Sequence, residues 1–165
     1  MLFRSKRSIE EKRGKIQISH DITERPAGAE KRSEIGHWEA DTVVGKQGKA
    51  CLVTLVDRKS RYLMCGKADK KNAQAVSRAM IDLLLGAKAL SVTPDRGKEF
   101  ARHADVTEYL DGLLREYFPK GKDITEIPDD YIQRKVAMIN LRPRKCLNYR
   151  TPYEVHFEKV VLHLA

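Results

Sequence analysis

Two aspartates, Asp41 and Asp95, each belong to a short stretch whose residue pattern is typical of a β-strand. Asp41 lies between Gly36 and Gly45, in a stretch that ends in the β-branched residues 42–44. Because side chains alternate across a strand, Asp41 shares one face with Glu39 and Val43. A buried ionised carboxylate is costly unless a cation or hydrogen bonds compensate it. Two interpretations stay open, a metal ligand or a solvated strand face with Glu39 and Asp41 turned to water, and this stretch alone favours the second.

Asp95 follows Pro94 and the short predicted strand 90–93, where the strand would give way to the glycine-containing loop Asp95–Phe100. Pro94 predicts that this strand ends there or lies at the edge of a sheet. Carboxylates on two adjacent strands could hold divalent metal, and Mg²⁺ prefers one or two carboxylates with water and phosphate oxygens. Paired metal ions can activate the attacking oxygen and stabilise the leaving one in phosphodiester transfer. The alternative for Asp95 is an ordinary aspartate that opens a turn.

Basic residues dominate the charge of the chain. The 165 residues include 32 Lys and Arg against 23 Asp and Glu, which gives a net charge of +9 and a pI near 9.5. This balance predicts a polyanionic partner without defining a reaction. Between Tyr131 and Arg150 there is no acidic residue, and we expect phosphate contacts from six basic ones, with a solvated basic surface as the alternative: Arg134, Lys135, Arg142, Arg144, Lys145 and Arg150.

Other functional classes find no support in the residue pattern. The three cysteines have no CxxC spacing and are expected to be free thiols in a reducing compartment, and the five histidines form no zinc signature. The longest apolar runs are too short to cross a bilayer, and the first residues lack the apolar core of a signal peptide. We therefore expect a cytoplasmic protein without membrane contact.

The elements that would position the aspartates follow from hydrophobic periodicity. Residues 36–45, 51–56 and 61–65 read as three strands of an antiparallel meander, the second buried on both faces. A helix is predicted from about Asn72, its cap, to Gly86, so the strand at 90–93 should run parallel to an earlier strand. Further helices are predicted over 105–118 and from about Pro128 to Asn140. Asp57 ends the second strand and is interpreted as structural.

Two regions differ in composition. Residues 1–35 are charged and poor in apolar side chains, and Pro26–Ala29 is expected to interrupt any helix, so we predict an extended or partly ordered arm. Residues 36–165 hold the predicted strands and helices and should form one domain with a basic C-terminal segment.

Four motifs in order resemble the catalytic core of insertion-sequence transposases of the IS30 family. They are Gly36–Thr42, Val56–Arg61, Asp95–Phe100, and Asn140–Leu147 with Thr151–Val155 after it. The resemblance runs from about Arg13 to the C-terminus. It implies an α/β, ribonuclease-H-like fold of the retroviral integrase type, a mixed sheet with flanking helices.

The resemblance also implies a function. Such cores use two Asp and one Glu to bind Mg²⁺ or Mn²⁺ and to cleave and join DNA, with element ends and target DNA as partners and homo-oligomers among the expected assemblies. Asp41 matches the first Asp and Asp95 the second, so the metal interpretation of Asp41 overtakes the solvated one. A bacterial, nucleoid-associated location follows from the same resemblance.

The sequence departs from the family at two places. Nothing before residue 36 reads as the family's helix-turn-helix region, and the segment between Asp95 and the next helix is too short for a fifth strand. Glu108 aligns either with the catalytic Glu or with the helix before the apparent deletion, and the second alignment is preferred. The alternative function is therefore an inactive transposase remnant that only binds DNA.

Overall fold

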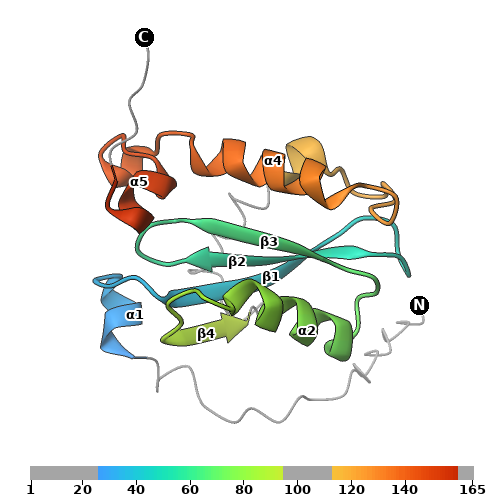
Figure 1. Ribbon diagram of the computed structural model, residues 1–165, viewed down its shortest axis with the longest axis horizontal. Coiled ribbons are helices and arrows are strands. Elements are labelled where there is room, and N and C mark those ends of the chain that lie inside the picture. Colours follow the sequence, from blue (N-terminus) through green and yellow to red (C-terminus); the bar gives the residue numbers. More distant parts are fainter. Residues whose placement is uncertain (1–25, 95–112, 160–165) are drawn as a thin grey trace, which may run out of the picture.

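The computed structural model describes residues 26–94 and 113–159, which form a mixed α/β unit with helices on both faces of a sheet (Figure 1). The described strands are β1 (His37–Val44), β2 (Cys51–Asp57), β3 (Leu63–Ala68) and β4 (Ser91–Pro94), in the order β3-β2-β1-β4. β1 pairs antiparallel with β2 and parallel with β4, and β2 pairs antiparallel with β3. The meander and the parallel fourth strand are confirmed, and no fifth strand occurs among the described residues.

Two helices cover opposite faces of the sheet (Figure 1). α2 (Ala73–Leu84) packs through Ala79 and Met80 against the face that presents Trp38, Val53 and Leu55. α4 (Asp129–Asn140) packs on the other face with the helical residues 113–117, against Val43 and Leu52 among others. Every residue of β2 is buried because both of its faces are covered, as its continuous apolar run predicted.

The predicted ends of α2 and α4 are confirmed. The Asn72 side chain accepts a hydrogen bond from the Ala75 N–H and begins α2, and Gly86, at φ +80°, follows its end. Pro128 caps α4. Of the helix predicted over 105–118, residues before 113 lie outside the described parts of the chain.

Two expectations about local structure were wrong. The third strand begins at Leu63, because Arg61 has a φ of 61° and belongs to the preceding turn. Pro26 begins a short helix, α1 (Ala27–Lys31), where we expected an interruption. Proline is tolerated at a helix start, where its missing N–H would have no partner.

The C-terminal segment adds a 3₁₀ turn, η3 (Lys145–Leu147), and a short helix, α5 (Pro152–Phe157). The Thr151 side chain and Glu154 form a reciprocal capping box at the start of α5. Among the described residues, no helix is long and apolar enough to cross a bilayer.

Candidate active site

Asp41 lies near the middle of β1 and is half-buried. Its backbone is fixed in the sheet opposite Thr54, whose hydroxyl donates to the Asp41 carbonyl at 3.2 Å. One carboxylate oxygen, Oδ1, accepts the N–H of the next residue, Thr42, at 2.6 Å. Within the described parts of the chain, no Lys, Arg or His side chain neutralises this carboxylate. A partly exposed, unneutralised carboxylate on a rigid strand fits the preference of Mg²⁺ and Mn²⁺ for oxygen ligands.

The second aspartate follows from the register of β1 and β4. Ala40 is paired with Pro94 in a parallel ladder, so the next residue along each chain is an aspartate, Asp41 and Asp95. Asp95 lies outside the described residues. Glu108 also lies outside them. The described residues taken alone contain no group of three His, Cys, Asp or Glu that could hold a metal.

Glu39 does not point to water, so the solvated interpretation of this strand face was wrong for that residue. Glu39 is 8% exposed and pairs with Arg58, which is 1% exposed. Arg58 also donates through Nε to the Ala29 carbonyl at 2.8 Å, so it connects α1 to Glu39 on β1. The two buried charges compensate each other. On this part of the strand, Asp41 alone remains as a candidate metal ligand.

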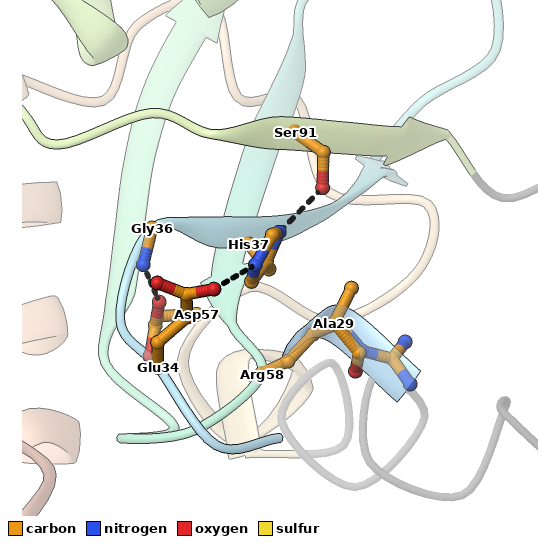
Figure 2. A network of polar contacts seen from close by, with 7 residues as sticks. All are labelled: Ala29, Glu34, Gly36, His37, Asp57, Arg58 and Ser91. Atoms are coloured by element: carbon orange, nitrogen blue, oxygen red, sulfur yellow. Dashed lines mark hydrogen bonds and ion pairs between the residues drawn. The ribbon is translucent and has the colours of Figure 1, made fainter. Parts of the chain in front are cut away.

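Asp57 is structural, as predicted. Its fully buried carboxylate accepts four hydrogen bonds, from the N–H groups of Gly36, Lys59 and Ser60 and from the Ser60 hydroxyl, at 2.7–3.2 Å. Figure 2 shows the bond from Gly36, which ties the start of β1 to the turn after β2. A carboxylate with this many donors has no need of a metal ion.

His37 connects the starts of β1 and β4. Its Nδ1 lies 2.8 Å from the Ser91 hydroxyl and its Nε2 lies 3.5 Å from a carboxylate oxygen of Glu34 (Figure 2). The ring is 2% exposed. This contact fixes the start of the β1–β4 pair. Asp41 and Pro94 lie toward the other end of the same pair.

A second histidine, His156 on α5, lies against the turn after β2. Its Nδ1 is 3.0 Å from the Ser60 hydroxyl, which donates its own hydrogen to Asp57. His156 therefore donates to Ser60, and Ser60 is not activated as a nucleophile. Burial against Tyr62 and Trp38 lowers the pKa of His156, while the negative charge of Asp57 opposes this shift.

The six basic residues expected to contact phosphate do not form one free surface. Arg144 is 6% exposed, and its guanidinium donates to the Ile139 carbonyl at 3.1 Å. Arg134 pairs at 3.1 Å with Asp130, one turn earlier on α4, and Arg142 pairs at 3.7 Å with Glu116, which comes from a distant part of the sequence. The Lys135 ammonium lies over the rings of Tyr117 and Tyr131. Lys145 and Arg150 are exposed.

Sequence reasoning missed two features. The burial of Arg58 was not foreseen, although Arg58 lies within the motif Val56–Arg61 that carries the family resemblance. The turn at residues 45–49 was given no role, although a second turn of the same glycine–lysine composition, 119–122, packs beside it. The repeated composition was the available signal for the second feature.

Comparison with known protein families decides between the possible identities of this arrangement. The family model described as "Integrase core domain" matches residues 31–115, just over half of the chain and the part that contains both aspartates. The chain belongs to the integrase core domain family. The retroviral-integrase-type core expected from the four motifs is therefore confirmed as an integrase core domain.

Transposases are among the relatives of this integrase core domain. It is 33% identical over 172 residues to the transposase for insertion sequence element IS4351 of Bacteroides fragilis, which spans 90% of this chain and 52% of that protein. It is 34% identical over 169 residues to transposase InsI for insertion sequence element IS30A of Escherichia coli K12, covering 87% of this chain and 44% of that protein. The predicted resemblance to IS30-family transposases is confirmed. The chain spans about half the length of these relatives.

Solved structures share the fold. The catalytic core domain of HTLV-2 integrase, in complex with magnesium, superposes with a TM-score of 0.53 at 22% identity, over 73% of this chain and 95% of that one. A chain of the simian T-cell lymphotropic virus intasome superposes with a TM-score of 0.54 at 15% identity, over 79% and 57% of the two chains. The predicted integrase-type fold is confirmed.

Proposed function

We propose that this integrase core domain catalyses metal-dependent cleavage and strand transfer at DNA phosphodiester bonds, in the transposition of an insertion sequence. Asp41 and Asp95 are the proposed metal ligands, and Glu108 is the candidate third carboxylate, although the preferred alignment places it on the helix before the apparent deletion. The observation that carries the proposal is the parallel pairing of Ala40 with Pro94, because Asp41 and Asp95 are the residues that follow this pair in the sequence.

The residues of the chain supply the ligand geometry. A bound Mg²⁺ or Mn²⁺ would activate the attacking oxygen and stabilise the leaving one. The Thr42 N–H holds Oδ1 of Asp41, so the carboxylate has a fixed orientation before any ligand arrives. β1 is paired on both sides, with β2 and β4, and this pairing limits the movement of Asp41 relative to the start of the Asp95 loop. Such preorganisation is what a site for phosphoryl transfer requires.

The names of the relatives support the substrate and the assembly. Two of them are transposases for insertion sequence elements, and the HTLV-2 core was solved with magnesium in a dimeric form. We propose that this chain likewise acts on element ends and target DNA, binds Mg²⁺ or Mn²⁺, forms homo-oligomers and works in the bacterial cytoplasm at the nucleoid. Residues 1–35 would act as an arm and 36–165 as the core. Lys145 and Arg150 are proposed phosphate contacts of the C-terminal segment, with Arg134, Lys135 and Arg142 beside them.

The experiment is a nicking and strand-transfer assay on DNA that carries the element's ends, with Mg²⁺ or Mn²⁺. Asp41→Asn and Asp95→Asn should each abolish cleavage while Asp82→Asn, on the exposed side of α2, leaves it unchanged. Loss of cleavage in Glu108→Gln would assign the third carboxylate to Glu108. DNA binding by the wild-type chain without any metal-dependent cleavage would contradict the proposal and favour the inactive remnant.

A further inference from the structure

We infer that two paired turns, residues 45–49 and 119–122, form the surface that holds the phosphate backbone of DNA beside Asp41. We call them the lysine–glycine turns, because their sequences are Gly-Lys-Gln-Gly-Lys and Pro-Lys-Gly-Lys. The inference rests on the proposed function, since it assumes a DNA substrate at Asp41, and it deepens that proposal by naming where the substrate binds.

The two turns are built against each other. The Lys46 N–H donates to the Lys122 carbonyl at 2.9 Å, and the Gly121 N–H donates to the Gly45 carbonyl at 3.2 Å. A Cβ on Gly45 would lie only 2.2 Å from the Lys122 carbonyl oxygen, so this close approach requires glycine. The Arg115 side chain adds a third link, donating to the Val44 carbonyl at 2.6 Å just before the first turn. Two segments more than seventy residues apart thus form one fixed surface.

The surface carries an excess of exposed positive charge. All four lysines are exposed: Lys46, Lys49, Lys120 and Lys122. The adjoining acid, Asp123, approaches Lys49 only at 4.0 Å. Hydrogen bonds from Thr125 are the main cause of the lowered pKa of Asp123, and the positive charges of the lysines lower it further. Lysine acts on phosphate as a point charge that needs no fixed side-chain geometry, so exposed lysines on a rigid backbone suit sequence-independent contact with DNA.

Strand direction places this surface at the catalytic end of the sheet. β1 runs from His37 through Asp41 to Val44 and directly into the first turn, and β4 runs parallel to it toward Pro94. Val44 is three positions after Asp41, which is about 10 Å along a strand. Phosphates held at the turns would therefore flank a scissile bond at Asp41.

The basic residues of the C-terminal segment lie toward the opposite end of the sheet. α4 begins near Lys67, which pairs with Asp129, and ends at Asn140, whose side chain bonds the backbone of Leu63. Leu63 starts β3 and is paired with Val56, next to the turn that contacts the start of β1. Arg142, Lys145 and Arg150 follow this end of α4. The turns, and not the C-terminal segment, lie at the end of the sheet where β1 passes Asp41 and β4 ends at Pro94.

The test measures the DNA affinity of three variants of the full chain, matched in charge or in location. Fluorescence anisotropy with a short DNA duplex of mixed sequence gives the affinity at each of a series of salt concentrations. The first converts the four turn lysines to Gln. The control converts four lysines near the other end of the sheet, Lys31, Lys59, Lys88 and Lys159, to Gln. The third converts Arg142, Lys145 and Arg150 to Gln. Circular dichroism and denaturation confirm that each variant is folded.

The turn variant should bind on the order of tenfold or more weakly, and the slope of log K against log salt should fall by about 0.9 for each phosphate that the variant no longer neutralises. The control should change both quantities much less. Equal weakening in the turn variant and the control, or a larger weakening in the C-terminal variant, would overturn the inference. The proposed function has its own readout, because Asp41→Asn must abolish cleavage whichever lysines hold the DNA.

Discussion

The Asp57 carboxylate accepts the backbone N–H of Gly36 at 2.8 Å, across the turn that follows β2. This bond fixes the first residues of the strand that carries Asp41. Asp57 and Asp41 thus have opposite roles within one small sheet. One is fully buried and saturated with donors, and the other is half-buried with Oδ1 held by its own neighbour.

The contrast between these aspartates predicts that their substitution has very different effects on the free energy of unfolding. Asp57→Ala should lower the free energy of unfolding by at least about 3 kcal/mol, because hydrogen bonds to a charged group contribute about 1.5–3 kcal/mol each. Asp41→Asn should change it by less than about 0.5 kcal/mol. Urea denaturation followed by circular dichroism measures both. Equal destabilisation by the two substitutions would contradict the division into structural and functional carboxylates.

The Glu39–Arg58 pair predicts strong energetic coupling. Arg58→Ala should cost about 3–5 kcal/mol, because it removes the buried cation that pairs with Glu39. Removing both charges in Glu39→Gln with Arg58→Met should cost clearly less than the sum of the single substitutions. A double-mutant cycle in urea gives the coupling energy, and additive costs would show that the pair does not act as a unit.

Glycine at position 45 should be required by packing, in contrast to Gly48. Gly45→Ala should destabilise the fold by about 1–3 kcal/mol, since its Cβ would meet the Lys122 carbonyl and the Ile124 side chain. Gly48→Ala meets nothing within 4 Å and carries only the cost of its positive φ, about 1 kcal/mol. Thermal denaturation of the two variants distinguishes these costs. A Gly45→Ala protein as stable as wild type would contradict the pairing of the lysine–glycine turns.

The sheet was predictable because its residue pattern is locally consistent. The apolar run of β2, the Asn72 cap and the crossover from α2 to β4 each left one reasonable arrangement. α1 was missed because its stability comes from contact with the distant Arg58, which local propensity cannot show. The later start of β3 depends on the left-handed conformation of Arg61, an unusual choice for that residue type.

The candidate site was only partly visible in the sequence. Strand alternation placed Asp41 and Glu39 on one face, but only the structure shows that Arg58 neutralises Glu39. A count of charges along residues 131–150 left out Asp130, whose i,i+4 spacing to Arg134 is visible in the sequence, and could not reveal that Glu116 lies beside Arg142. The lysine–glycine turns depend on a contact between segments far apart in sequence, so spacing within either turn could not indicate it.

His156 predicts a loss of stability in mild acid. Its pKa is lowered in the folded state by burial, so the unfolded chain binds more protons near pH 6. Stability should therefore fall as the pH drops below the ordinary histidine value of about 6.5 and until the folded His156 is itself protonated. His156→Asn should reduce this dependence. Urea midpoints from pH 7.5 to 5 measure it, and an unchanged pH profile in His156→Asn would contradict the assignment.

Metal binding by the full chain tests the central claim most directly. Titration calorimetry with Mn²⁺, in the absence of DNA, compares wild type with Asp41→Asn and Asp95→Asn, and Asp82→Asn serves as the matched control. The account predicts that wild type and Asp82→Asn bind Mn²⁺ equally, whereas each of the other two binds on the order of tenfold more weakly, as removal of one carboxylate ligand from a hard-cation site implies. Binding to Asp41→Asn with wild-type affinity would contradict it.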